Sequence, residues 1–326
     1  MFPATRMRRS RASITMRDSL ADVKVRRDSL VMPVFVDENL REKKEIQEMR
    51  GIYRYDINSY RKHLDHLTAN GIRNILLFGI PSHKDSTGSA SYSSEGIVQK
   101  AIAIARENYS LNVMADLCLC EYTDTGQCGL IRNGAVDNDS TLKVYEKIAL
   151  SYAQAGVNVI APSGMMDGQV GVIRNALDTS GFNNTMIMAY SVKYASTLYN
   201  PFRYAADSAP REGDRKSYQM DYRRSQEWID EIELDINEGA DIIMVKPGLF
   251  YLDIVRSVRE RFHKPLAVYS VSGEYVMIRN AIDSGFLPQE TLEEYLYSFF
   301  RAGADLLITY FADYLTSGNV SLAAFR

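Results

Sequence analysis

A repeated junction between a helical segment, a glycine and an apolar run constrains the fold of this chain most strongly. Four such junctions read ANGIRNILL, AQAGVNVIA, NEGADIIMV and RAGADLLIT, and each has a glycine shortly before the apolar run. A glycine at this place is typical of a helix C-cap, because it readily adopts the left-handed backbone conformation that ends helices. The sequence therefore predicts helices that are each followed at once by a strand.

Eight apolar, β-branched runs recur along the 326 residues. Near-continuous apolar runs are typical of parallel strands that are buried on both faces. The runs cover residues 30–36, 74–80, 111–119, 157–162, 185–191, 241–247, 266–271 and 305–311. Eight helix–strand units predict an α/β fold, a closed (β/α)8 TIM barrel over residues 30–326. A doubly wound open sheet is the alternative, but it often carries a glycine-rich phosphate loop, and the sequence contains no GxGxxG.

Charge and composition bear on which partners the protein binds and in which compartment it works. A net charge of −3 gives no reason to expect a nucleic-acid partner. No apolar run reaches the roughly 18 residues that span a membrane. The start, MFPATRMRRSRAS, lacks the apolar core of a secretory signal. We therefore expect a cytoplasmic protein, while the Arg-rich start leaves import into a plastid or another organelle open.

Residues 1–29 precede the first predicted strand and are rich in arginine. We interpret them as an extended N-terminal arm outside the barrel. A disordered basic tail is the alternative that the pattern leaves open.

Two lysines stand at the ends of consecutive predicted strands. Lys193 closes MIMAYSVK and Lys246 closes DIIMVK. Side chains at the C-terminal ends of barrel strands point toward the active site. Two adjacent ammonium groups between apolar walls disfavour each other's protonation, and a neutral amine is a nucleophile that forms Schiff bases with ketones. The alternative is that each lysine extends to the rim and is solvated.

All three cysteines, Cys118, Cys120 and Cys128, lie in DLCLCEYTDTGQCG. The first two stand two positions apart on a predicted strand and project to one face, and the following turn returns the third. Three thiolates without a fourth protein ligand favour a catalytic zinc with an open position. Three buried or surface thiols are the alternative. The remaining candidate ligands are interpreted as structural or surface residues: His63, His66, His83 and His263.

These segments together resemble the porphobilinogen synthase (5-aminolevulinate dehydratase) family, from the basic arm to the last strand. The cysteine segment resembles the zinc-type version of the family's motif. SVKYASTLYNPFR and MVKPGLFYLDIV resemble its two active-site lysine segments, and YSVSGEYVMI resembles the stretch after its seventh strand. In the family, histidines often precede the last cysteine, whereas this chain has Asp124 to Gln127 there. The resemblance therefore does not extend to a histidine-dependent metal site.

The resemblance implies a hydro-lyase that condenses two 5-aminolevulinate molecules to porphobilinogen, with the loss of two waters. Lys246 would bind the ketone of the substrate that becomes the propionate half, and Lys193 the ketone on the acetate side. A zinc on the three cysteines would act as a Lewis acid. The resemblance also assigns substrate-binding positions, which are Asp116, Ser163, Tyr199, Phe202, Arg203, Arg215, Gln219, Tyr269, Ser272 and Tyr310.

The resemblance further implies a lid, an allosteric metal and an assembly. The lid covers about residues 200–223, where arginines would hold a carboxylate by charge-assisted hydrogen bonds. Glu231 falls on a position that binds an allosteric magnesium in many members, although a solvated glutamate is the alternative. The family is typically homo-octameric, with residues 1–29 contacting a neighbouring barrel.

Two other functions fit parts of the pattern. A class I aldolase would use one Schiff-base lysine in a barrel and would need no metal. A zinc- or redox-sensing protein would use the three thiols, but it would leave both strand-end lysines without a role.

Overall fold

The closed ring of parallel strands is the centre of the fold. The computed structural model describes residues 4–211, 213–318 and 325. Each strand of the ring pairs with the next, and the last pairs with the first through Leu30–Leu307 and Val31–Ile308, so the predicted (β/α)8 barrel is confirmed. In chain order the ring contains β1 (Leu30–Asp37), β4 (Asn74–Ile80), β5 (Asn112–Leu117), β8 (Val159–Pro162), β9 (Met186–Lys193), β10 (Ile242–Lys246), β11 (Leu266–Tyr269) and β12 (Leu306–Ile308).

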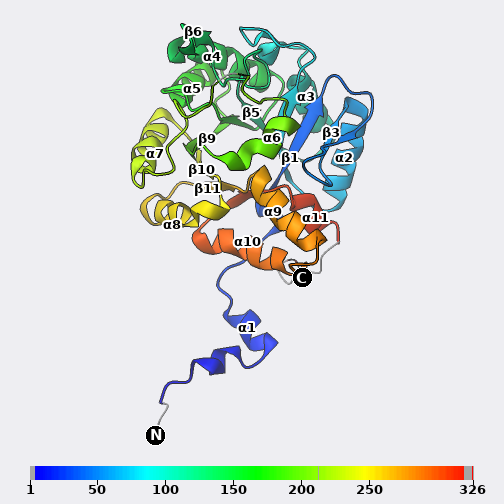
Figure 1. Ribbon diagram of the computed structural model, residues 1–326, viewed down its shortest axis with the longest axis vertical. Coiled ribbons are helices and arrows are strands. Elements are labelled where there is room, and N and C mark those ends of the chain that lie inside the picture. Colours follow the sequence, from blue (N-terminus) through cyan, green and yellow to red (C-terminus); the bar gives the residue numbers. More distant parts are fainter. Residues whose placement is uncertain (1–3, 212, 319–324, 326) are drawn as a thin grey trace.

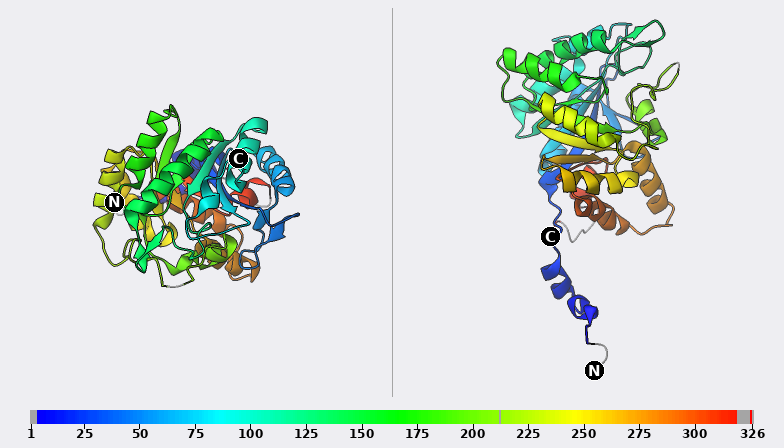
Figure 2. Two further views of the ribbon diagram at one scale, coloured as in Figure 1. Left: turned by 90° about the horizontal axis from the view of Figure 1, so that it is seen from above. Right: turned by 90° about the vertical axis from the view of Figure 1, so that its left-hand side faces the viewer.

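Helices surround the ring, as the views along and across the molecule show (Figure 1 and Figure 2). The α-helices of the barrel are α2 (Ile57–Ala69), α3 (Ile97–Asn108), α4 (Asn138–Gln154), α5 (Gln169–Thr179), α6 (Asn200–Ala205), α7 (Glu227–Glu238), α8 (Leu252–Arg261), α9 (Ser272–Asp283), α10 (Thr291–Ala302) and α11 (Ala312–Thr316). Single 3-10 turns lie at η2 (Arg27–Ser29), η3 (Ser89–Tyr92), η4 (Thr197–Tyr199) and η5 (Leu249–Tyr251).

Two short pairs of strands lie outside the ring and were not expected from the sequence. β3 (Tyr53–Tyr55) pairs parallel with the end of β1, and β2 (Lys44–Glu45) pairs antiparallel with β3. A hairpin of β6 (Ile131–Arg132) and β7 (Ala135–Val136) follows the cysteine segment. The first pair lies at the C-terminal end of β1, and the hairpin lies in the loop that follows β5.

The junction glycines have the conformation that their place in the sequence predicts. Gly239 ends α7 with a φ of 108°, and Gly303 ends α10 with a φ of 121°. Each amide donates back to carbonyls of the last helical turn, which a residue with a β-carbon would do only under strain. The barrel strands therefore begin within a few residues of the preceding helix.

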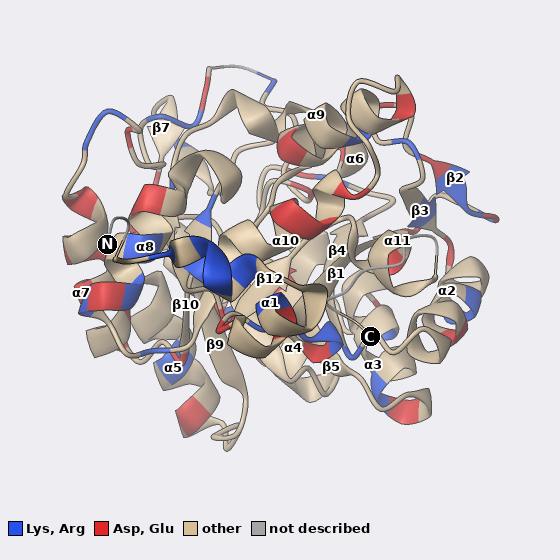
Figure 3. Ribbon diagram, turned by 90° about the horizontal axis from the view of Figure 1, so that it is seen from below, with Lys and Arg blue, Asp and Glu red and all other residues tan. Residues whose placement is uncertain are grey.

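The N-terminal arm projects away from the barrel (Figure 1). It contains the turn η1 (Met7–Arg11) and the short helix α1 (Ile14–Leu20), whose start is capped by the Ser13 side chain. The arginines of η1 make this part of the ribbon blue in the view from below (Figure 3). Among the described residues, no helix is long and apolar enough to cross a membrane.

Candidate active site

Lys193 and Lys246 lie directly beside each other at the C-terminal ends of β9 and β10. The two residues are paired in the register of these parallel strands. Their side chains are 5% and 6% exposed, so both amines are enclosed by protein. Because an unpaired ammonium is costly to bury, the placement of two of them together indicates a chemical role.

Four aromatic rings surround the Lys246 amine. Its Nζ lies 4.0 Å from the ring centre of Tyr269, 5.0 Å from that of Tyr190, and 5.3 Å from those of Tyr199 and Phe202. Ring faces favour the ammonium form, but burial and then the neighbouring Lys193 outweigh them and lower the pKa of Lys246 to about 7. A large fraction of this amine is therefore neutral and nucleophilic near pH 7.

The ring of Tyr190 lies near the amines of both lysines, and the sequence did not predict Tyr190 as a site residue. Strict strand alternation would place Tyr190 and Lys193, three positions apart, on opposite faces. The register between β9 and β10 shifts at this point, with Ala189 opposite Ile243 but Val192 opposite Val245. This bulge brings the Tyr190 ring within 5.4 Å of the Lys193 amine. A one-residue bulge of this kind leaves no clear signal in a run of apolar residues.

A hydrogen-bonded chain leads from Lys193 to a buried carboxyl group. The Lys193 amine donates to the main-chain carbonyl of Ser163, whose hydroxyl donates to Asp116 at 3.0 Å. Burial raises the pKa of Asp116 above its ordinary value, while the charges of both lysines oppose the shift. The Asp116 carboxyl group and the Ser163 hydroxyl therefore lie near the Lys193 amine.

The three thiols gather, although not on a strand. The prediction that Cys118 and Cys120 lie on one strand face is wrong, because β5 ends at Leu117. Both residues lie in the segment that follows the strand, where their Sγ atoms approach to 3.1 Å. The loop then returns Cys128, and all three sulfur atoms lie within 4.8 Å of one another.

The thiol cluster has the character of a soft-metal site. All three cysteines are buried and free of disulfides. Burial raises the pKa of Cys118 well above its ordinary value, whereas hydrogen bonds from the two neighbouring thiols lower that of Cys128 well below it. The main chain of Cys128 is held in place by Tyr145, whose hydroxyl donates to the Cys128 carbonyl at 2.7 Å. Three convergent buried sulfurs fit a tetrahedral thiophilic cation with one further position.

The predicted lid packs over the cysteine loop. Arg215 is 5% exposed and donates to the carbonyls of Gly126 and Ser208. Burial and then Arg215 lower the pKa of the Arg203 guanidinium, so the two positive groups lie near each other. Within the described chain, the Nε atoms of both arginines and both amide atoms of Gln219 are buried without a hydrogen-bond partner. The two Nε–H groups and the Gln219 amide nitrogen are unused donors that fit an anionic ligand.

Three further residues that the resemblance assigns to substrate binding lie on the side of β11, α9 and the end of β12. The Tyr310 and Tyr269 hydroxyls lie 3.1 Å apart, beside the aromatic box around Lys246. Ser272 is fully buried, but its hydroxyl already accepts from the Phe202 amide at 2.9 Å and donates to the Leu198 carbonyl at 3.3 Å. Ser272 therefore ties the start of the lid to α9 in this structure.

Glu231 lies in a different cavity, of about 810 Å³, beside the lid. Burial and then neighbouring carboxylates raise the pKa of Glu231 to about 7. We call this cavity the acidic pocket, and its acidic lining is Asp167, Asp221, Glu227, Glu231, Asp235 and Glu238. Gln219 of the lid lines the acidic pocket too.

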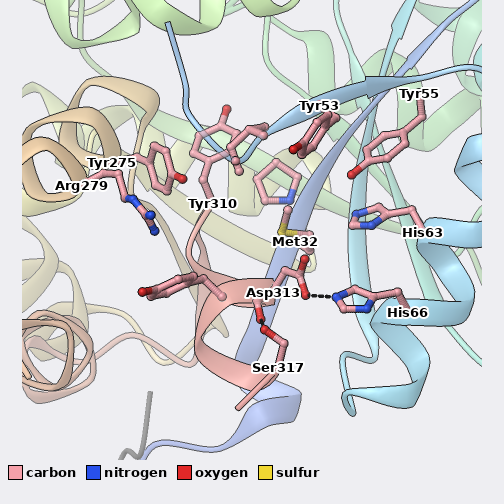
Figure 4. A pocket seen from close by; sticks show the side chains of 14 residues that line it. Met32, Tyr53, Tyr55, His63, His66, Tyr275, Arg279, Tyr310, Asp313 and Ser317 are labelled. Carbon is pink, nitrogen blue, oxygen red and sulfur yellow. Dashed lines mark hydrogen bonds and ion pairs between the residues drawn. The ribbon is translucent and has the colours of Figure 1, made fainter. Parts of the chain in front are cut away.

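The histidines take no part in the thiol cluster. His63 and His66 of α2 line a separate pocket of about 380 Å³ (Figure 4). His63 stacks on Tyr55 and burial lowers its pKa to about 3, while His66 contacts Asp313 at 2.7 Å. The other two histidines, at positions 83 and 263, are exposed.

Comparison with known proteins supports one family. A sequence model described as Delta-aminolevulinic acid dehydratase matches residues 4–317. A relative with that name from Archaeoglobus fulgidus is 50% identical over 310 residues, which cover 95% of this chain and 96% of the relative. A relative with the same name from Staphylococcus aureus is 47% identical over 311 residues, covering 94% and 96%.

A solved structure agrees with these sequences. The delta-aminolevulinic acid dehydratase (porphobilinogen synthase) of Toxoplasma gondii superimposes with a TM-score of 0.93 at 37% identity, over 96% of this chain and 91% of that chain. That protein was crystallised in complex with its reaction product, porphobilinogen.

Proposed function

The chain belongs to the delta-aminolevulinic acid dehydratase family, and from this premise we propose how its residues condense two molecules of 5-aminolevulinate into porphobilinogen. The reaction releases two waters, and the chain is an enzyme of the hydro-lyase class. The observation that carries the residue assignment is the register pairing of Lys193 with Lys246 at the mouth of the barrel.

Lys246 is the amine best suited to attack first. Its pKa of about 7 leaves a lone pair available, and the attack on the substrate ketone followed by loss of water gives a Schiff base. Lys193, on the neighbouring strand β9, then forms a Schiff base with the ketone of the second substrate molecule. Asp116 and Ser163 exchange protons with the reacting amine from their place beside Lys193.

The thiol cluster fits zinc as its metal. Cys118, Cys120 and Cys128 would supply three soft ligands, and a solvent or substrate atom would complete the coordination. Bound there, zinc supplies Lewis-acid polarisation toward the acetate-side substrate. Free buried thiols of this kind also fit a reducing compartment, and a cytoplasmic location stays a prediction.

Borohydride trapping tests the proposed chemistry. Reduction in the presence of 5-aminolevulinate should attach the substrate covalently to Lys246 and, at higher substrate concentration, to Lys193. Peptide mapping identifies the modified residues. A class I aldolase would react at one lysine and ignore a chelator, and a sensor protein would trap nothing. If neither Lys246 nor Lys193 is labelled, the assignment is wrong.

The lid arginines should affect the second substrate more than the first. Arg203→Ala or Arg215→Ala removes a charge-assisted hydrogen bond worth about 1.5–3 kcal/mol, so the acetate-side substrate requirement should rise roughly ten- to a hundredfold. Steady-state kinetics measure it, with exposed Arg211→Ala, also in the lid, as the control. Unchanged substrate dependence in both variants would place these arginines outside the site.

We also propose the acidic pocket as the magnesium site. Mg²⁺ keeps several waters and needs only one or two carboxylates, which suits Glu231 among its acidic neighbours. Glu231→Gln should abolish any stimulation of turnover by magnesium while leaving zinc-dependent turnover in place. Glu233→Gln, on the same helix but ion-paired at the surface, is the control. Equal stimulation in both variants would exclude Glu231.

The arm supports a homo-octameric assembly, whose size is taken from the family. Ile14, Met16 and Leu20 of α1 are 60%, 44% and 57% exposed. A seven-residue helix is marginal by itself, so these side chains need another surface to pack on. Sedimentation should give an octamer for the full chain and a smaller species for residues 30–326. Identical sedimentation of the two would remove the arm from the assembly.

A further inference from the structure

Glu274 is a fully buried carboxylate in the first turn of α9, and the proposed reaction gives it no role. Burial raises its pKa to about 7, and hydrogen bonds, the largest of them from the Leu249 amide, oppose the shift. Above that pH the protein keeps a buried negative charge at a cost in folding free energy. The contacts of its two oxygen atoms show what this charge holds together.

Both oxygens of Glu274 accept from main-chain amides, and the two amides belong to different loops. The Leu249 amide donates to Oε1 at 2.8 Å, and the Val271 amide donates to Oε2 at 3.0 Å. Leu249 comes three residues after Lys246, whereas Val271 directly precedes α9. A carboxylate accepts at both oxygens, while a glutamine amide accepts at only one. The charge of Glu274 therefore joins the loop after β10 to the start of α9.

The start of α9 is joined in turn to the segment that leads into the lid. The Ser272 hydroxyl accepts from the Phe202 amide at 2.9 Å. A β-carbon at Gly273 would lie only 2.7 Å from the Leu198 carbonyl oxygen and 2.8 Å from the Leu198 Cα. The main chains of α9 and η4 are thus in direct contact, which only a glycine at this position allows.

This path returns to the amine of Lys246. The ring of Phe202 lies 5.3 Å from its Nζ, and so does the ring of Tyr199, whose hydroxyl donates to the Lys246 main-chain carbonyl at 3.3 Å. Hydrogen bonds thus run from the loop after Lys246 through Glu274 and the start of α9 to the rings around the amine. We call this path the Lys246 circuit. A closed circuit of this kind holds the amine and its surrounding rings in one geometry.

We infer that Glu274 is a positioning residue for Lys246, which couples the start of the lid to the loop that carries the amine. The inference rests on the proposed role of Lys246 as the attacking amine and goes beyond it. Glu274 acts through the two main-chain amides that it binds rather than on the substrate.

Borohydride labelling of Glu274→Gln tests this role. The variant keeps the shape of the side chain but sets an NH2 group against one of the two amides. The turnover number should fall roughly ten- to a hundredfold, because a displaced amine attacks less often. The pH midpoint of labelling at Lys246 should also rise above about 7, since water that enters the loosened ring box favours the ammonium form.

Asp56→Asn is the matched control. Asp56 is also a buried carboxylate that accepts from two main-chain amides, those of Asn58 and Ser59, but it caps α2 and lies outside the Lys246 circuit. Its replacement should lower the unfolding temperature, as Glu274→Gln should, while turnover and the midpoint of labelling stay as in the parent. A structural role alone would give the two variants the same behaviour.

Gly273→Ala loosens the same circuit from its other side without removing a charge. The added methyl group would push α9 away from Leu198, and labelling at Lys246 should slow and shift as in Glu274→Gln. If Glu274→Gln does not fold, Gly273→Ala decides alone. Labelling that matches the parent in the variants of the circuit, or that changes equally in Asp56→Asn, overturns the inference. A parent that is not labelled at Lys246 overturns the proposed function instead.

Discussion

Replacing Lys246 by Met should abolish porphobilinogen formation, to less than about a hundredth of the parent rate, because no other group supplies the first Schiff base. The barrel should stay folded. Methionine is unbranched and apolar, and the rings of Tyr269, Tyr190 and Tyr199 that now surround the amine would pack against it. Product assays and thermal unfolding followed by circular dichroism measure the two effects separately.

The pH dependence of trapping gives an independent check. Because the pKa of Lys246 is about 7, lowering the pH further converts the amine to an ammonium without a lone pair. Borohydride labelling should therefore fall about tenfold per pH unit below that value and level off above it. Lys100→Met, at an exposed ion pair of α3, is the control and should label and turn over like the parent. Retained turnover in Lys246→Met would end the assignment.

Removing the metal should have an effect of similar size. A chelator should abolish turnover, and added zinc should restore it, while the fold persists because the closed ring of strands does not depend on the thiol cluster.

Cys120→Ala leaves two thiolates and should lose both zinc and activity. Since thiolates bind metal only when deprotonated, zinc affinity should fall with pH. Elemental analysis of active protein decides the question. Activity without zinc would show that the thiols are not a catalytic metal site.

Oxidation should mimic chelation. The Cys118 and Cys120 sulfur atoms already lie 3.1 Å apart, so loss of two electrons and two protons would join them. Reductant should reverse the loss of activity as long as only disulfides or sulfenic acids have formed. Irreversible loss at low oxidant would indicate damage elsewhere in the chain.

The fold followed from local rules that the structure obeys. Buried parallel strands give continuous apolar runs, and junction glycines such as Gly239 and Gly303 mark where helices end. Lys193 and Lys246 stood out because a charge at the end of an apolar run is unusual. Each of these signals lies within about ten residues of sequence, so no knowledge of distant contacts was needed.

The rest of the candidate site depends on geometry that sequence does not encode locally. The bulge that brings Tyr190 beside Lys193 is a property of the pairing between β9 and β10. Strand β5 ends one residue before Cys118, which changed how the thiols meet but not that they meet. The hydrogen bonds of the Ser272 hydroxyl depend on contacts between α9 and the start of the lid, which are far apart in the sequence.

The pairing of Lys193 with Lys246 sets the distance between the points at which the two lysine side chains leave the backbone. Neighbouring strands are held about 4.8 Å apart by main-chain hydrogen bonds, a spacing that side-chain substitution cannot alter. Two molecules of 5-aminolevulinate bound to these lysines would thus be attached at neighbouring points of the backbone, with their orientation left to the residues around them. An amino ketone with a longer chain should therefore bind at one of these lysines without closing a ring with a molecule at the other.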